Sequence, residues 1–168
     1  MGFTGGVHNA TTGSTVELFV TDSNNKLIQV EKTPSGSWTY TDISTGYQLK
    51  GKPAVLWGTT GVDVFTIAKD GALVQHHTNF GQGTWDVYTV LPASKNFDGG
   101  VDAVLSGSTV ELFLANTAHH LVQAEKTPTS PWVTYDIRTD YEVDYAPTII
   151  WGTSGVDVYA NGKDGALK

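Results

Sequence analysis

The stretch Gly13-Ser14-Thr15-Val16-Glu17-Leu18-Phe19 returns letter for letter at residues 107–113, and the repetition extends well beyond it. Residues 13–74 and 107–168 align without a gap at an offset of 94, and about half of the aligned positions are identical. Each 94-residue unit is itself double, because Trp38, Trp85 and Trp132 are spaced by 47. A period in the forties that is rich in β-branched residues and glycine is typical of a β-propeller blade.

The pattern within each period favours strands. Apolar and polar residues alternate over 16–20 and again over 27–31, and the polar turn 22–25 separates them. Asp70-Gly71 is a strong hairpin signal, because glycine accepts a positive φ. We therefore expect an all-β fold, a β-propeller of four-stranded antiparallel blades with about 3.5 blades in the chain. The blades are expected at about residues 3–46, 52–94, 97–140 and 146–168, the last of them incomplete.

Composition and charge narrow the function classes. The formal net charge is −7 and the only arginine is Arg138, which argues against nucleic-acid binding because phosphate contacts need clustered lysine and arginine. The absence of cysteine excludes disulfides and thiolate metal sites but leaves the compartment, secreted or cytoplasmic, undecided. No apolar run is long enough for a membrane span.

Residues 56–65, with Lys69-Asp70-Gly71-Ala72-Leu73 after them, resemble the repeat of the Photorhabdus-type seven-bladed propeller lectins. That repeat runs through a Trp-Gly, a hydrophobic-Asp-Val-Phe, an Asp-Gly-Ala-Leu and an outer-strand Trp. The even blades match it best, as residues 151–159 show again. The resemblance implies a non-catalytic, sugar-binding protein with sites between neighbouring blades, and fucose-like or O-methylated sugars as ligands.

The Aleuria-type fucose lectins are a more distant comparison. Their site uses an arginine on the second strand, a glutamate on the third and an aromatic residue from the next blade. In this chain, acidic residues stand where that arginine would be and glutamines stand where that glutamate would be. The resemblance therefore does not carry that site over intact. The acidic residues are Glu17, Asp63 and Glu111, and the glutamines are Gln29, Gln75 and Gln123.

The repeated residues are of the types that bind a neutral sugar. An aromatic ring can lie against the apolar C–H face of the sugar, while carboxylates and amides fix its hydroxyl groups. Weak single sites gain avidity when they are repeated. The candidate rings are Trp38, Trp57, Trp85, Trp132 and Trp151, the candidate acceptors are Glu17, Asp63, Glu111 and Asp157, and the candidate amides are Gln29, Gln75 and Gln123.

Each candidate also has a purely structural interpretation. A Trp at the start of every outer strand can pack one blade on the next, and a recurring acid can bond a neighbouring loop. Trp57 and Trp151 differ in kind, because only even blades carry them, and a residue absent from alternate repeats is not required to build a blade.

Metal binding and catalysis find little support. His76-His77 and His119-His120 are adjacent pairs, and neighbours on a strand point to opposite faces, so neither pair readily chelates one metal. A sialidase-type site needs an arginine cluster. A glycosidase could use two carboxylates at the ring centre, although equal repetition favours equivalent sites over one asymmetric pair. We expect no enzyme activity and no cofactor.

The expected partners are glycans and a second copy of the chain. An open stack of blades exposes sheet faces that invite pairing, and two chains hold about seven blades' worth of sequence. A homo-dimer that closes one ring is the preferred arrangement. The leading alternative function is a propeller scaffold for a protein or peptide, and a glycosidase comes third.

Overall fold

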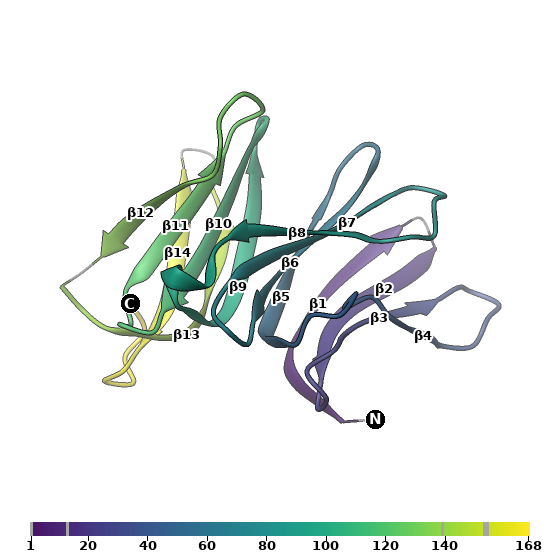
Figure 1. Cartoon of the computed structure of the whole chain (residues 1–168), viewed down its shortest axis with the longest axis horizontal. Coiled ribbons are helices and arrows are strands. Elements are labelled where there is room, and N and C mark those ends of the chain that lie inside the picture. The colour runs from purple at the N-terminus through teal and green to yellow at the C-terminus, as the bar shows by residue number, and fades with distance from the viewer. Residues whose placement is uncertain (1, 13, 139, 153–154) are drawn as a thin grey trace.

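The computed structural model of the chain describes residues 2–12, 14–138, 140–152 and 155–168. Within these residues the chain forms three four-stranded antiparallel sheets and one two-stranded sheet (Figure 1). We call these sheets blades 1 to 4 in chain order. The prediction of an all-β propeller with four-stranded antiparallel blades is thereby confirmed.

The strands have the following bounds. Blade 1 contains β1 (Phe3–Thr12), β2 (Thr15–Asp22), β3 (Leu27–Lys32) and β4 (Thr39–Asp42). Blade 2 contains β5 (Leu49–Trp57), β6 (Gly61–Ala68), β7 (Leu73–Asn79) and β8 (Asp86–Leu91). A short 3₁₀ turn (Ala93–Lys95) leads to blade 3, which contains β9 (Phe97–Ser106), β10 (Thr109–Asn116), β11 (Leu121–Lys126) and β12 (Val133–Arg138). Blade 4 contains β13 (Val143–Trp151) and β14 (Val156–Gly162).

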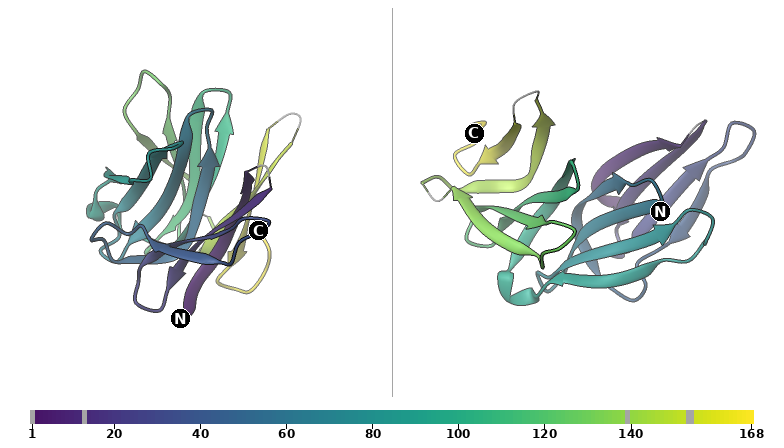
Figure 2. Two further views of the ribbon diagram at one scale, coloured as in Figure 1. Left: turned by 90° about the vertical axis from the view of Figure 1, so that its right-hand side faces the viewer. Right: turned by 90° about the horizontal axis from the view of Figure 1, so that it is seen from above.

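The strands of each full blade pair in chain order, and the first strand of each blade faces the first strand of the next. Figure 2 shows the blades following one another from the purple N-terminal sheet to the yellow C-terminal one. Two details differ from the sequence prediction. Each outer strand begins one residue after its Trp, and the expected third strand of blade 4 is reduced to an isolated bridge between Asn161 and Leu167.

The hydrophobic core lies in the seams between blades. Phe19 of β2 and Val64 of β6 belong to one buried cluster, which joins blades 1 and 2. Phe65 of β6 and Leu112 of β10 belong to another, which joins blades 2 and 3. The side chains of a strand alternate between its two faces, so Val64 and Phe65 bury opposite faces of blade 2. A blade therefore depends on its neighbours to bury both of its faces.

A column of glycines lets the inner strands approach one another. Each inner strand shifts register against its partner at a bulge, and Gly51 and Gly99 occupy two of these bulges with φ of 73° and 80°. A Cβ on Gly51 would lie 1.2 Å from the carbonyl oxygen of Gly99, and a Cβ on Gly5 would lie 2.4 Å from that of Gly51. Only glycine fits both the conformation and the space. Tyr145 occupies the matching bulge of blade 4 with φ of 64° and is 68 % exposed.

Among the residues that the structure describes, no helix is long and apolar enough to cross a lipid bilayer.

Candidate functional site

A hydrogen-bonded pair of an acid and a glutamine recurs in the three full blades. The side-chain amide of Gln29 donates to the carboxylate of Glu17 over 2.9 Å. Gln75 donates to Asp63 over 2.7 Å, and Gln123 donates to Glu111 over 3.0 Å. Each pair joins the second and third strands of its blade diagonally, on one face of the sheet. Each of these acids thus bonds to a glutamine of its own blade.

Two of the recurring tryptophans lie across a seam from such a pair. Trp85 stands just before β8 and meets Phe19 of blade 1 edge to face, with ring centroids 6.0 Å apart. Trp132 stands just before β12 and meets Phe65 of blade 2 in the same way at 5.9 Å. Both tryptophans are partly buried and pack against the seam cores. Each ring therefore belongs to one blade and contacts the preceding one.

The first seam pocket lies between blades 1 and 2 and has a volume of about 490 Å³. It combines Glu17 and Gln29 of blade 1 with Trp57 and Trp85 of blade 2. The loop that follows β7 supplies Phe80. The remaining lining residues are Glu31, Thr41, Val62, Thr78, Asn79, Gly81 and Gly83.

Trp57 adds an aromatic platform to this pocket. Its ring stacks on Phe80 with centroids 5.9 Å apart and planes at 18°. The indole N–H of Trp57 is buried and has no hydrogen-bond partner, the one such side-chain atom in the described part of the chain. A buried donor without a partner is costly and rare, and a water or a ligand in the pocket is one way to complete its bonding.

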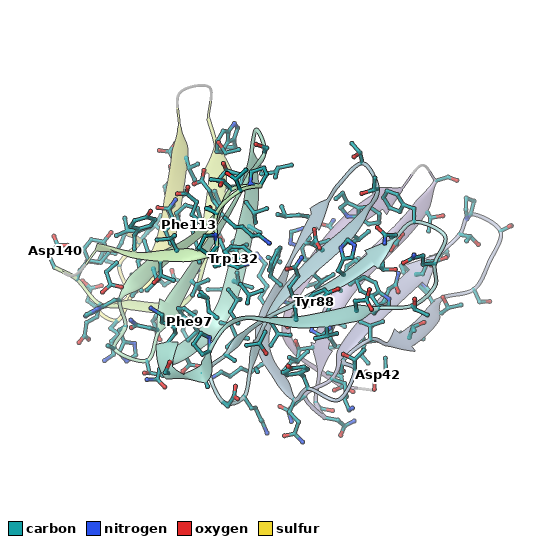
Figure 3. All side chains as sticks on the ribbon, turned by 45° about the horizontal axis from the view of Figure 1, so that its top comes forward. Asp42, Tyr88, Phe97, Phe113, Trp132 and Asp140 are labelled. Carbon is teal, nitrogen blue, oxygen red and sulfur yellow. The ribbon has the colours of Figure 1, made fainter. Side chains whose placement is uncertain are left out.

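The second seam pocket lies between blades 2 and 3 and has a volume of about 470 Å³. It combines Asp63 and Gln75 of blade 2 with Trp132 of blade 3. Figure 3 marks Tyr88, on β8, and Trp132, which come to this pocket from adjacent blades. The remaining lining residues are His77, Thr89, Val90 and Lys126. A smaller hollow of about 180 Å³ adjoins it and shares Asp63, Gln75, Lys126 and Trp132.

The other candidate residues lie outside these two pockets. Trp38 is 42 % exposed, and the ammonium of Lys32 lies over its ring at 5.5 Å. Trp151 is 50 % exposed on β13, and Asp157 is exposed on β14. The Glu111–Gln123 pair forms as in the other blades. The position that corresponds to Trp85 in the second 94-residue unit would be residue 179, and the sequence given has 168.

The histidines of the first pair have separate roles. His76 is fully buried, where its Nδ1 lies 3.1 Å from the carbonyl oxygen of Ile43 and its Nε2 lies 3.2 Å from the hydroxyl of Thr66. Burial lowers the pKa of His76 to about 4, so the ring is neutral and ties blade 2 to blade 1. His77 points to the other face, where its Nδ1 lies 2.8 Å from Asp63. Among the residues described, no three His, Asp or Glu side chains gather as metal ligands would.

Sequence reasoning missed several residues that line the pockets. Thr41 and Tyr88 pair with Gln29 and Gln75 across the third and fourth strands, so the register of the outer strand brings them to the pockets. Thr78 and Lys126 hold the same place in the register, because each pairs with the first valine of its second strand. Aligning the blades on their recurring glutamines would have pointed to this last pair.

No protein-family model matches the chain, and no curated protein matches it. Solved structures do match it. SapL1 lectin, solved in complex with alpha methyl fucoside, has a TM-score of 0.73 and 16 % identity over 99 % of this chain and 58 % of that chain. BP39L lectin from Burkholderia pseudomallei has a TM-score of 0.68 and 16 % identity over 97 % and 51 %. The six-bladed fungal lectin from Aleuria aurantia has a TM-score of 0.59 and 11 % identity over 96 % and 58 %.

This chain is a partial β-propeller. Its fold is that of the Aleuria-type lectins, and it spans between 51 % and 58 % of the length of the three structures named above. No family match supports the closer resemblance to the Photorhabdus-type repeat, which stays a prediction.

Proposed function

We propose that the chain is a non-catalytic lectin that binds neutral saccharides, of the fucose-like or O-methylated kind, in the pockets between its blades. One observation carries the proposal. An acid–glutamine pair of one blade faces a tryptophan of the next blade across a pocket, and this happens at two successive seams. Both pockets have volumes in the range of small-molecule sites, about 300 to 1,000 Å³.

The arrangement suits a sugar chemically. The rings of Trp85 and Trp132 offer an apolar surface for the C–H face of a pyranose. In each pair the glutamine amide is held by the carboxylate, which fixes its orientation before a ligand arrives. The structural neighbours add support, since they are lectins and SapL1 was solved with a methyl fucoside.

Calorimetric titration with methyl α-L-fucoside, after a glycan array has identified the preferred sugars, tests the proposal. The double variant Gln29→Ala/Gln75→Ala should weaken binding by at least about tenfold, since polar contacts in both pockets are lost. Gln123→Ala is the matched control, because Gln123 makes the same bond within its blade but lines neither seam pocket. The ligand should be recovered unchanged after prolonged incubation.

Two results would contradict the proposal. One is the absence of binding to every glycan on the array, which would favour a protein or peptide partner. The other is an equal loss of affinity in Gln123→Ala, because the glutamines would then act through the fold and not through the pockets.

We also propose that two copies of the chain associate and close one ring. Large apolar side chains of blades 1 and 4 are exposed, which a second copy would cover. They include Phe3, Tyr40, Tyr145, Ile150 and Trp151. Light scattering should give twice the chain mass of 18.0 kDa. A mass of 18.0 kDa at micromolar concentration would overturn this part of the proposal.

A further inference from the structure

The two seam pockets differ in charge. The described lining residues of the first pocket include the carboxylates of Glu17 and Glu31 but no lysine, arginine or histidine. The second pocket contains one carboxylate, that of Asp63, together with Lys126 and His77. Because both pockets are built from corresponding positions of the repeat, this difference comes from substitutions and not from a different architecture.

Lys126 is the decisive residue. It ends β11, and its ammonium lies over the ring of Trp132, 6.0 Å from the centroid. Among the described residues, the salt bridges of the chain are made by other lysines and by histidines. The ammonium thus lies beside the proposed sugar platform, and no carboxylate of the described residues forms a salt bridge with it.

The carboxylate of the same pocket, that of Asp63, already has two partners within its own blade. Asp63 accepts a hydrogen bond from the amide of Gln75 over 2.7 Å, and its Oδ1 lies 2.8 Å from Nδ1 of His77. In the first pocket the residue that corresponds to His77 is Glu31, which adds a second negative charge. The second pocket therefore repels an anionic ligand less than the first pocket does, and Lys126 of the second pocket attracts the anion.

The lysine alternates along the repeat. Lys32 lies over Trp38 in blade 1 and Lys126 lies over Trp132 in blade 3. Each of these lysines pairs with the first valine of its second strand, and the residue that does so in blade 2 is Thr78. Thr78 donates its hydroxyl to the carbonyl oxygen of Thr84 in its own blade over 2.8 Å. A cation thus stands at this position in the odd blades, and an uncharged hydroxyl stands there in the even blade.

We propose that the second seam pocket prefers a monosaccharide unit that carries a carboxylate or a sulfate group, with Lys126 as the residue that recognises the anion. This inference rests on the proposed lectin function and deepens it. The first seam pocket, whose described lining includes no cation, takes neutral units. The chain then presents two chemically different sites in succession.

The test uses a matched pair of ligands, methyl β-D-glucuronide and methyl β-D-glucoside, which differ only at C6. A third ligand, the 6-sulfate of the glucoside, separates carboxylate from sulfate recognition. Titrations followed by NMR of the indole N–H groups of Trp132 and Trp85 report the two pockets separately. The readout at each Trp is the ratio of the affinities for the anionic and the neutral ligand.

At Trp132 the wild-type ratio should favour an anionic ligand by about tenfold, the usual size of one charge-assisted contact. Lys126→Asn should bring the ratio close to one, and Thr78→Lys, the exchange at the corresponding position of blade 2, should raise the ratio at Trp85. Lys32→Asn is the control, because it removes a lysine that lies over a tryptophan outside both pockets and should leave both ratios unchanged.

The outcomes separate the two proposals. If neutral glycosides bind but the ratio at Trp132 is near one, or survives in Lys126→Asn, the charge preference is wrong and the lectin proposal stands. If no saccharide, methyl α-L-fucoside included, shifts either indole signal, the lectin proposal fails and the charge preference fails with it.

Discussion

Trp85 meets Phe19 of the preceding blade edge to face, with the ring planes at 74°. Trp132 and Phe65 repeat the contact one blade later at 76°. The same two tryptophans line the seam pockets. Each of these tryptophans can therefore pack against the neighbouring blade and contact a ligand at the same time. One edge of the ring meets the neighbouring blade, and the residue also lines the pocket.

Trp85→Ala should destabilise the protein by about 3 kcal/mol, since truncation of a packed tryptophan removes both its burial and its contact with Phe19. Trp38→Ala is the matched control. Its ring is 42 % exposed and contacts Lys32, so the loss should be below about 1 kcal/mol. Urea denaturation measures both, and equal losses would show that the seam contact contributes nothing.

Trp57→Ala and Trp151→Ala should behave differently, although the sequence suggests that the two residues are equivalent. Trp57 packs against the seam core and stacks on Phe80, so its truncation should cost about 2–4 kcal/mol. In the single chain Trp151 is 50 % exposed, so at concentrations too low for dimers its truncation should change stability by less than about 0.5 kcal/mol. Thermal unfolding distinguishes them. A matching drop in Tm for the two variants would show that the ring of Trp151 is covered in solution, for example by a second copy.

Stability should fall as the pH is lowered from 6.5 towards 4. Burial lowers the pKa of His76 from 6.5 to about 4, so below pH 6.5 the unfolded chain binds a proton that the folded chain resists. The loss should reach about 3 kcal/mol near pH 4, at 1.36 kcal/mol for each unit of the shift. Burial also lowers the pKa of His8, which adds to the loss in the same direction.

Urea denaturation across this pH range checks the effect of His76. The carboxyls of Asp42 and Asp98 have lowered pKa values and add their own losses only at still lower pH. In His76→Asn most of the dependence between pH 6.5 and 4 should disappear. An unchanged slope in that variant would assign the dependence to another group.

Gly51→Ala should prevent folding or destabilise the chain by more than about 4 kcal/mol, since its Cβ would lie 1.2 Å from a carbonyl oxygen of the next blade. Gly107→Ala is the control for backbone strain alone. Gly107 also has a positive φ, 61°, but nothing lies within 4 Å of an added Cβ, so the cost should stay near 1–2 kcal/mol. Circular dichroism and urea denaturation of the two variants separate the two effects. Comparable stabilities would show that the inner strands can move apart.

The sequence predicts the blades well because their determinants are local. The alternation over β2 and β3 and the Asp70-Gly71 turn repeat at a fixed period, and each is visible within a few residues. The recurring tryptophans, acids and glutamines are found by the same period. The in-blade bond between Gln29 and Glu17 follows from strand register, which the sequence does not state.

The sequence does not reveal which side chains are packed and which line a pocket, because both depend on contacts between blades. The exposed ring of Trp151 and the packed ring of Trp57 have nearly identical sequence surroundings, but Trp57 packs against the seam core and stacks on Phe80. Lys126 and His77 look like ordinary surface residues until the seam brings them beside Trp132. The residues that line a pocket thus come from two blades, and the sequence pattern of one blade identifies only those that this blade contributes.

Tyr145 has a geometric consequence for any larger assembly. By the 94-residue offset it corresponds to Gly51, the residue whose bare α-carbon admits the inner strand of the following blade. A sheet docked on blade 4 in the way that blade 3 docks on blade 2 would collide with that phenol side chain. In any propeller that includes this chain, the next inner strand must therefore lie farther from blade 4 than β9 lies from β5. The rotational symmetry of the propeller is broken at that seam.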